Sequence, residues 1–499
     1  AGGLDIKSSP LEMLDRRHQN RLTVARNMVL STSGAVSKRL DAATLTTTSV
    51  GGTVAITGGV QFRHSNGTDY TLFWTDDGRL MSLNSDGTTT ALASGLATGR
   101  RWSFAVYNDK AIACNGSNAP RFYDGTSVSL LGGAPPSAGS VVVTHRNRVW
   151  MLDSDETSRV SFCALNNEED WTTRLNAGAF FVDDNDAGGP LVGMLSLLGG
   201  ELILGKRYAI KRVQGATYDE ISQVPVSMHT GIGLASFQAF VQAVNDGWFM
   251  SEDGPQTLMT VQQFGDLKQA QPSERIHPYF YPNTTFTMSL NRLGLSQAIY
   301  DGQHNRIYWA IDTDNDGQNE TILVYDVYLK AWTAPWTGIR VASFWLVRDS
   351  TTGRREVYAG GYDGHIRVLN RSVSTNTIDG RARHLTDLGM PGVEKSLRRL
   401  YLYFAAALNR SVTVVTRFDF GKTGGQSYSI SLAGPTKTLG VDWVLGVDQL
   451  GLVSDFAHRI DTTGLGETFE IEVRNGNAGE PFTWHGYEAM FRPRRAIRR

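Results

Sequence analysis

Cysteine, charge and long apolar runs are all scarce in this 499-residue sequence. Its two cysteines, Cys114 and Cys163, are too few for a disulfide scaffold and lack the spacing of metal ligands. No stretch approaches the roughly 20 apolar residues that a membrane-spanning helix needs, and no apolar run follows the N-terminal residues as in a secretion signal. We therefore expect reduced core cysteines in a protein that is neither an integral membrane protein nor an obvious secretory one.

The sequence also lacks an excess of charge of either sign. Charged residues make up 19% of the chain and the formal net charge is −1, so nothing draws the whole molecule toward nucleic acid or an anionic membrane. One local patch is present, because residues 491–499 include five arginines. This segment could contact phosphates or an acidic protein surface. It could equally be a solvated tail or the charged protection of a strand edge.

What the sequence has in abundance is the material of turns and strands. It contains 53 glycines, 17 tyrosines and 11 tryptophans among 41% hydrophobic residues, a composition that favours a turn-rich all-β protein. Four of the tryptophans, at 102, 150, 248 and 309, fall within apolar strand patterns, so we expect them in the core rather than in sugar-stacking loops. The length predicts two or three structural units, or a closed repeat with an appendage.

A degenerate repeat runs through the middle of the chain. An apolar alternating strand meets a tight polar turn, a second strand returns, and the unit ends near Tyr-Asp-Gly or a relative of it. About seven units occur at spacings of roughly 30 to 60 residues, as in a β-propeller. We predict a propeller over residues 46–372 with six to eight blades, seven fitting best. The units begin near 70, 102, 141, 195, 240, 297 and 356.

The pattern changes on both sides of this repeat. After Asn370 a turn cluster at 387–392 precedes alternating strands, which predict a β-sandwich over residues 373–499. Before the repeat, residues 1–45 form an N-terminal arm, in which residues 11–29 match the helical period only loosely and predict either a short helix or an irregular segment. The strands expected in the sandwich lie near 395–404, 412–420, 427–432, 458–460, 468–474 and 484–491.

One acidic segment has the spacing of a metal site. Asp312, Asp314 and Asp316 stand at alternate positions before Gly317, with Glu320 close behind, and calcium loops require carboxylate oxygens that converge in this way. The twelfth position is a leucine, so the bidentate glutamate of an EF-hand loop is absent. The segment also joins two apolar strands, and an acidic hairpin tip would explain it without an ion. We predict a possible structural calcium site at these four residues and no other cofactor.

No catalytic motif emerges from the rest of the sequence. The segment Gly200–Lys206 has the spacing of a phosphate-binding loop, but Arg207 replaces the required hydroxyl residue and the interior is strand material. The ten histidines lack metal-ligand spacing, and there is no Gly-x-Ser-x-Gly or His-Glu-x-x-His motif. We therefore predict no catalytic residues and a protein that is not an enzyme.

Several ordered motifs resemble one protein family. The chain opens with Gly-Gly-Leu at 2–4, continues with Ala-Arg-Asn-Met-Val at 25–29 and Gly-Ala-Val-Ser-Lys-Arg at 34–39, and carries Asn-Asp-Gly-Trp-Phe-Met at 245–250 and Phe-Thr-Trp-His-Gly-Tyr at 482–487. Each motif is short, but their order over most of the chain resembles the propeller-bearing nozzle, or tail hub, proteins of short-tailed bacteriophages.

The resemblance implies a structural virion protein located in the phage tail and assembled in the cytoplasm of the host bacterium. It implies a homo-oligomeric ring, a hexamer in this family, that lies below the portal and its adaptor, surrounds the channel through which double-stranded DNA leaves, and links to fibres or distal tail parts. It transfers no active-site residues.

Two other functions stay open on the sequence. The first is a carbohydrate- or protein-binding β-propeller at a cell surface or in a host-attachment organelle, which would use loops on one face of the ring. The second is an enzyme on a propeller scaffold, such as a glycoside hydrolase, because the fold alone does not forbid activity.

Overall fold

The chain folds into two compact units made almost entirely of β-strands. The computed structural model describes residues 2–496 except 16–19, 183–187, 198–199, 214, 216–217, 222–225, 260–271, 282–287, 350–351, 373–375, 390–392, 406, 408–409 and 433–454. The ring unit comprises residues 43–323 and 338–369, and the two-sheet unit comprises residues 1–42, 324–337 and 370–499. Within the described part of the chain, no helix has the length and apolar character needed to cross a membrane.

The helices among the described residues have one or two turns. None is longer than six residues, so they serve as connections rather than as layers. They are α1 (Pro10–Met13), α2 (Tyr218–Ile221), α4 (Leu290–Leu293), η1 (Phe237–Ala239), η3 (Glu274–Tyr279) and η4 (Asp419–Gly421).

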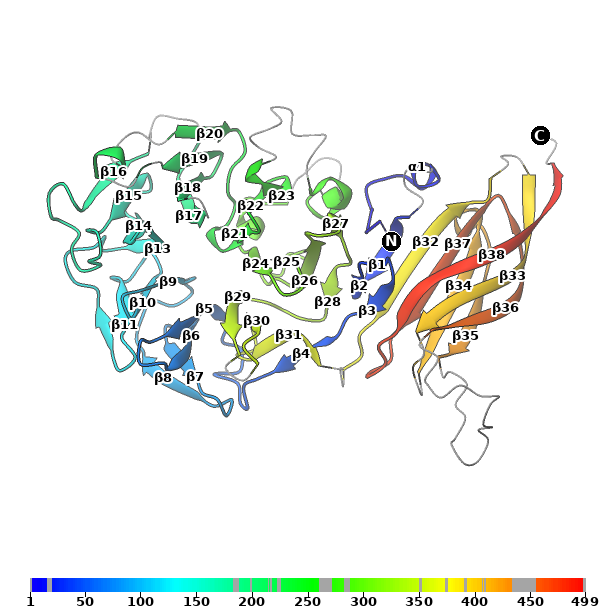
Figure 1. Cartoon of the computed structure of the whole chain (residues 1–499), viewed down its shortest axis with the longest axis horizontal. Helices are drawn as coiled ribbons and strands as arrows, with labels where there is room; N and C mark the ends of the chain where they lie inside the picture. The colour runs from blue at the N-terminus through cyan, green and yellow to red at the C-terminus, as the bar shows by residue number, and fades with distance from the viewer. Residues whose placement is uncertain are drawn as a thin grey trace, which may run out of the picture. The chain divides into compact units, whose positions relative to one another are not determined.

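Seven sheets, most of them four-stranded and antiparallel, follow one another along the described chain from residue 56 to residue 372 (Figure 1). The last one takes its fourth strand from the N-terminal part of the sequence. The sheets consist of β5 (Ile56–Arg63), β6 (Asp69–Thr75), β7 (Leu80–Leu83) and β8 (Thr89–Ala93); β9 (Ser103–Tyr107), β10 (Lys110–Cys114), β11 (Arg121–Tyr123) and β12 (Val128–Leu130); β13 (Gly139–His145), β14 (Arg148–Asp153), β15 (Arg159–Phe162) and β16 (Gly178–Phe181); β17 (Leu191–Leu197), β18 (Glu201–Lys206), β19 (Ala209–Val213) and β20 (Val226–Thr230); β21 (Phe240–Ala243), β22 (Asp246–Ser251) and β23 (Gly254–Thr257); β24 (Gln297–Asp301), β25 (Arg306–Ile311), β26 (Thr321–Asp326), β27 (Ala331–Trp332) and β28 (Trp336–Thr337); β29 (Ser343–Arg348), β30 (Arg355–Gly360), β31 (Ile366–Ser372) and β4 (Asp41–Thr44).

The first strands of these sheets contact each other in a closed cycle. Strand β5 contacts β9, and the contacts continue through β13, β17, β21, β24 and β29 back to β5. The side chain of Gln61 strengthens the contact between β29 and β5. Its Nε2 donates to the backbone carbonyl of Arg348 at 3.0 Å, and its Oε1 accepts from the backbone amide of the same residue at 2.7 Å. This arrangement of mostly four-stranded antiparallel sheets is consistent with a β-propeller, and the predicted all-β class is confirmed.

The tight turns form where the sequence supplies residues that tolerate positive φ. Asn108 and Asp109, with φ of 44° and 55°, join β9 to β10. This is the backbone geometry that two-residue hairpins need to match the twist of their strands. Arg146 and Asn147, with φ of 47° and 56°, do the same between β13 and β14.

Aromatic side chains fill the spaces between adjacent sheets. Trp74 and Trp102, from neighbouring sheets, stack with ring centroids 3.6 Å apart and planes 3° from parallel. The four tryptophans predicted for the core are all buried, with at most 7% of their surface exposed. The thiols of Cys114 and Cys163 are free and buried, and burial raises the pKa of Cys163 to about 11. Both residues are therefore packing elements, as predicted.

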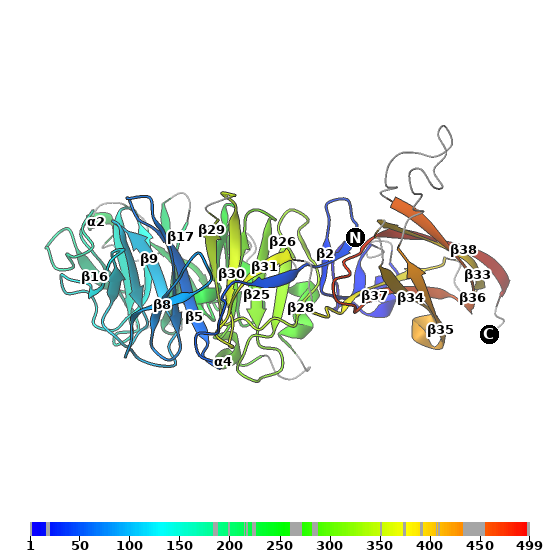
Figure 2. The same ribbon diagram turned by 90° about the horizontal axis from the view of Figure 1, so that it is seen from below.

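Two five-stranded sheets form the core of the two-sheet unit (Figure 2). They pack together through side chains such as Phe469, whose ring lies 5.5 Å from that of Phe491 on the opposite sheet. The strands expected from the sequence are confirmed. In order across each sheet they are β1 (Leu22–Arg26), β32 (Gly380–Asp387), β37 (Thr468–Asn475), β34 (Ser411–Phe418) and β35 (Thr423–Ser431); β2 (Met28–Leu30), β3 (Val36–Lys38), β38 (Thr483–Ala496), β33 (Val393–Ala405) and β36 (Asp455–Gly466).

The N-terminal segment differs from the expected helix or irregular stretch. After one turn of helix at α1 it forms β1, β2 and β3, which pair with β32, with each other and with β38. Among the described residues of the segment 11–29, the helical alternative is wrong beyond Met13, because β1 and β2 occupy 22–26 and 28–30. The pairing of β1 with β32 shifts register between Leu22 and Val24, so the buried residues of β1 do not alternate strictly, and this partner strand lies more than 340 residues further along the chain.

A buried histidine gives the ring unit a predicted pH dependence. The Nδ1 atom of His145 on β13 lies 2.9 Å from the hydroxyl of Ser196 on β17, and burial, helped by the neighbouring Arg146, lowers the pKa of His145 to about 4. The unfolded chain takes up this proton near pH 6.5. Stability therefore falls as the pH drops from about 6.5 to about 4, by at most about 1.4 kcal/mol per pH unit. We expect His145→Asn to flatten the dependence of the melting temperature on pH in this window. Equal slopes for both proteins would contradict this assignment.

Candidate functional site

The motifs at 25–29 and 34–39 meet inside the two-sheet unit and form a buried polar cluster. Asn27, at a positive φ of 52°, donates through Nδ2 to the hydroxyl of Thr337 and to the carbonyl of Asp379, at 3.2 and 3.1 Å. Its Oδ1 accepts from Nε of Arg39 at 2.9 Å and from the amide of Thr337 at 2.8 Å. All four hydrogen-bonding positions of this side chain are thus satisfied, which buried amides require.

Arg39 completes this cluster. Its guanidinium donates to the carbonyls of Thr337 and Leu40, lies 3.6 Å from the carboxylate of Asp41, and stacks over the ring of Trp336 with 5.5 Å between the guanidinium carbon and the ring centroid. Only 2% of the side chain is exposed, and burial lowers its pKa to about 10, so it stays charged at neutral pH. A single guanidinium thereby links the N-terminal segment to residues 336–337.

Lys38 makes the corresponding link to the C-terminal part of the unit. Its ammonium donates to Oδ1 of Asn475 and to the carbonyl of Asn477, both at 2.8 Å. Burial lowers the pKa of Lys38 to about 8. The consecutive residues Lys38 and Arg39 therefore bind different segments, since Lys38 contacts residues 475–477 and Arg39 contacts Asn27 and Thr337. We call Asn27, Lys38, Arg39, Thr337 and Asn475 the assembly knot.

Removing the guanidinium should destabilise the two-sheet unit strongly. Arg39→Met keeps the volume of the side chain but leaves Asn27, Asp41 and two carbonyls without their donor, which typically costs about 3–5 kcal/mol. We expect a clear fall in the melting temperature, measured by calorimetry. The matched control is Arg26→Met, since 54% of the Arg26 side chain is exposed, and its effect should stay within about 0.5 kcal/mol. Similar melting temperatures for the two variants would refute the role of the knot.

The four acidic residues predicted as calcium ligands lie together at a hairpin tip. Each of Asp312, Asp314, Asp316 and Glu320 has a carboxylate oxygen within 4.8 Å of those of the others. The tip joins β25 to β26, as the sequence indicates. Carboxylate oxygens are the donors that a hard cation such as Ca²⁺ requires, so the residue types fit the ion.

Protein groups already satisfy much of this cluster. Asp312 accepts hydrogen bonds from the amides of Asn315 and Gly317 and lies 3.6 Å from Arg292, and Asp316 forms an ion pair with Arg340 at 2.9 Å. These donors and cations account for the loop as an acidic hairpin tip. The calcium site stays a prediction.

A second polar network crosses the centre of the ring unit near the starts of its first strands. The amide of Gln238, in η1, donates to the carbonyls of Thr57 and Trp102, at 3.0 and 3.3 Å. Arg101 donates in the opposite direction, to the carbonyls of Gly294 and Leu295. These bonds join the first two sheets to the elements that begin the fifth and sixth, so we call them the axial network.

The axial network should contribute measurably to the stability of the ring. Gln238→Ala removes three hydrogen bonds, the two donated by Nε2 and the one that Oε1 accepts from Gln297, and leaves buried carbonyls unpaired, at a cost of about 1–3 kcal/mol. Urea unfolding should therefore show a lower midpoint. Gln242→Ala is the matched control, because the one hydrogen bond of the Gln242 side chain among the described residues goes to the nearby carbonyl of Val244. Equal midpoints for the two alanine variants would mean that the network adds nothing to stability.

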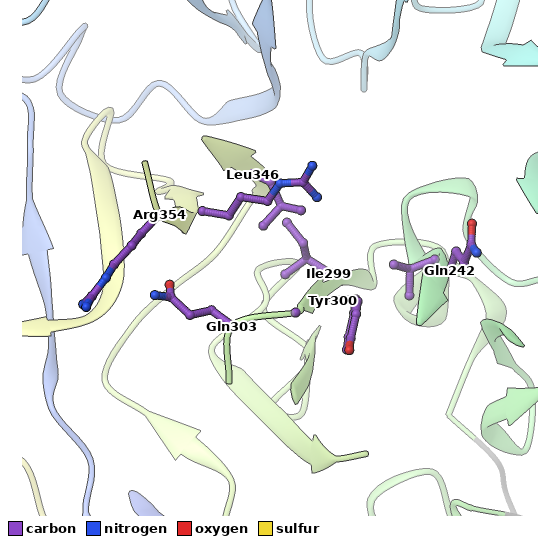
Figure 3. Close-up of a pocket in the computed structure, with 9 residues that line it drawn as sticks. Gln242, Ile299, Tyr300, Gln303, Leu346 and Arg354 are labelled. Carbon is purple, nitrogen blue, oxygen red and sulfur yellow. The ribbon is translucent and has the colours of Figure 1, made fainter. Parts of the chain in front are cut away.

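A pocket of about 490 Å³ opens among the ends of β21, β24 and β29, away from the axial network (Figure 3). Its size is within the range of about 300–1,000 Å³ typical of ligand sites. Figure 3 shows Ile299, Tyr300 and Leu346 close together, with Gln303 and Arg354 on one side and Gln242 on the other. The lining residues are Val241, Gln242, Ile299, Tyr300, Gly302, Gln303, Leu346, Arg354 and Arg355.

Other candidate segments have structural roles. The phosphate-loop-like segment ends in β18, an interior strand of its sheet, and Lys206 is buried, as the strand interpretation predicts. Residues 491–496 of the arginine-rich terminus belong to β38, where Arg492 pairs with Ser396 of β33. This part is therefore a paired strand and not a solvated tail, while residues 497–499 lie outside the described residues.

Sequence reasoning missed both polar networks and the pocket. The knot joins Arg39 to Thr337, 298 positions away, and Lys38 to Asn475, 437 positions away, and the pocket combines three sheets, so neither has a local periodic signal. The available hint was the pair Lys38-Arg39 inside an otherwise apolar strand pattern.

No known protein family and no curated protein matches this sequence. Among solved structures, the computationally designed Ika8 protein is 11% identical over 66% of this chain and all of its own, with a TM-score of 0.38. The extracellular domain of the putative one-component system BT4673 from B. thetaiotaomicron is 11% identical, covering 75% of this chain and 45% of its own, with a TM-score of 0.42. YCF48 from Cyanidioschyzon merolae is 12% identical over 64% of this chain and 97% of its own, with a TM-score of 0.39. Likenesses of this strength carry no functional argument.

Proposed function

We propose that this chain is a structural protein of a short-tailed bacteriophage tail. Copies of it form a ring, hexameric as in the resembled family, below the portal and adaptor and around the DNA exit channel, and fibres or distal tail parts attach to it. The protein is assembled in the bacterial cytoplasm, acts in the virion tail and has no catalytic role. Its domains are a seven-bladed propeller over 46–372, an assembly domain over 373–499 and an arm over 1–45.

The assembly knot is the observation that carries this proposal. The resemblance depends on the motifs at 25–29 and 34–39, and Asn27, Lys38 and Arg39 from these motifs are the residues that organise the two-sheet unit. A buried charge costs free energy unless well-placed partners pair with it, so losing any one of these partners destabilises the fold strongly. The motifs therefore have a physical function in holding together the unit to which we assign assembly.

The axial network supports a rigid block rather than a conduit. Hydrogen bonds from Gln238 and Arg101 cross the centre of the ring unit, so duplex DNA would pass between copies of the chain and not through one propeller. A subunit with a near-zero net charge is suited to such a position, because it does not retain passing DNA.

Electron microscopy of particles tests the location directly. Phage particles purified from the source lysate are labelled with a gold-conjugated antibody to this protein. Label confined to the tail at a single vertex is the expected result. Absence of label on both intact and disrupted particles would exclude the tail assignment and favour the alternative of a binding propeller.

A further inference from the structure

We infer that the pocket at the ends of β21, β24 and β29 binds an acidic sugar, with the cationic side chains Arg354 and Arg355 at its rim attracting the carboxylate. The inference goes beyond the proposed tail function and does not depend on it. It rests on the position of the pocket, on the unpaired charge at its rim and on the combination of side chains inside it.

The position of the pocket makes it accessible. Ile299 and Leu346 lie two residues from the ends of β24 and β29, and Gln242 lies one residue from the end of β21. All three strands are first strands of their sheets, so the pocket opens where the first hairpin turns emerge. Ile299 is buried with 7% exposed, whereas Gly302, Gln303, Arg354 and Arg355 are exposed. An apolar floor thus lies beneath a polar rim.

The acidic and basic side chains at this rim differ in whether they are paired. Asp301 accepts from the amides of Gln303 and His304 and lies 2.6 Å from Nδ1 of His304, so its own turn uses its carboxylate. In contrast, the guanidiniums of Arg354 and Arg355 have no hydrogen bond or ion pair with the described residues. Two cations without partners at a concave rim create a local positive field that favours an anion.

Guanidinium groups select carboxylates by their shape. Each guanidinium presents parallel N–H donors that match both oxygens of a carboxylate, and such bidentate pairs are among the stronger hydrogen bonds in proteins. A sulfate or phosphate would satisfy the same donors. The remaining lining residues favour a sugar that carries a carboxylate over a free sulfate or phosphate ion.

Those remaining residues match a pyranose ring. The amides of Gln242 and Gln303 can both donate to and accept from hydroxyl groups. Tyr300, with its hydroxyl 3.2 Å from Oδ1 of Asn305, presents an aromatic ring, and Val241, Ile299 and Leu346 offer apolar contacts for the C–H face of a sugar. An acidic peptide would use the arginines but would leave the paired amides and this aromatic floor with less to bind.

Calorimetric titration of the full chain tests the site. A uronic acid tetrasaccharide is the probe, and a neutral tetrasaccharide with the same linkage is the comparison. We expect the acidic probe to bind at least tenfold more tightly and to weaken as salt is added, because the recognition is ionic. Equal binding of the two probes, or no binding of the acidic one, would overturn the inference while leaving the tail assignment intact.

Variants locate the binding. The double variant Arg354→Gln, Arg355→Gln should weaken binding of the acidic probe at least tenfold, and both positions are exposed, so the fold should be retained. Arg63→Gln is the matched control, since Arg63 ends β5 beside a first hairpin turn of another sheet, with 60% of its side chain exposed, and it does not line the pocket. Equal losses in both proteins would place the binding elsewhere. A glutamate tetrapeptide that displaces the sugar at lower concentration would point to a protein partner and refute the sugar.

Discussion

The contact between β5 and β29 is the constraint on which the ring unit depends. It joins segments 287 residues apart, and until it forms, the first and last sheets each leave one apolar face uncovered. Such a long closure costs chain entropy that only the completed set of contacts returns. At this contact the side chain of Gln61 takes the place of a neighbouring strand, because it forms hydrogen bonds with both the amide and the carbonyl of Arg348. The long closure also makes the ring a fold of high contact order, which is expected to form slowly.

The distribution of buried charge follows from the same need for long-range closure. Apolar packing holds neighbouring sheets together but is tolerant of register. Hydrogen-bonded charges such as Arg39 do not tolerate a shift in register, because a displaced guanidinium would lose several hydrogen-bond partners together. The knot and the axial network both lie where distant segments meet, so they specify which segments meet there. The arginines at the rim of the pocket are different, since their guanidiniums form no hydrogen bond or ion pair with the described residues.

Local features of this fold were predictable and long-range ones were not. Alternating apolar residues located the strands of the repeat and of the C-terminal sheets, and the Asn-Asp pair at 108–109 marked a hairpin with positive φ. The acidic residues at 312–320 were correctly grouped, because neighbours in a short loop must lie close together. The N-terminal strands were missed because β1 and β3 pair with β32 and β38, strands that lie hundreds of residues away in the sequence. The pocket was missed for the same reason.

Strand β4 has a consequence of its own for how copies of this chain can meet. It comes from the N-terminal segment yet completes the sheet of β29, β30 and β31. A chain that inserted its β4 beside the β31 of a neighbouring copy would keep every hydrogen bond of that sheet, so exchange of this strand between copies costs little once they are held side by side. When β4 is not docked, the edge of β31 exposes unpaired N–H and C=O groups, which can pair with a strand of another chain. Early pairing of β4 with β31 is therefore what keeps newly made chains from joining at that edge.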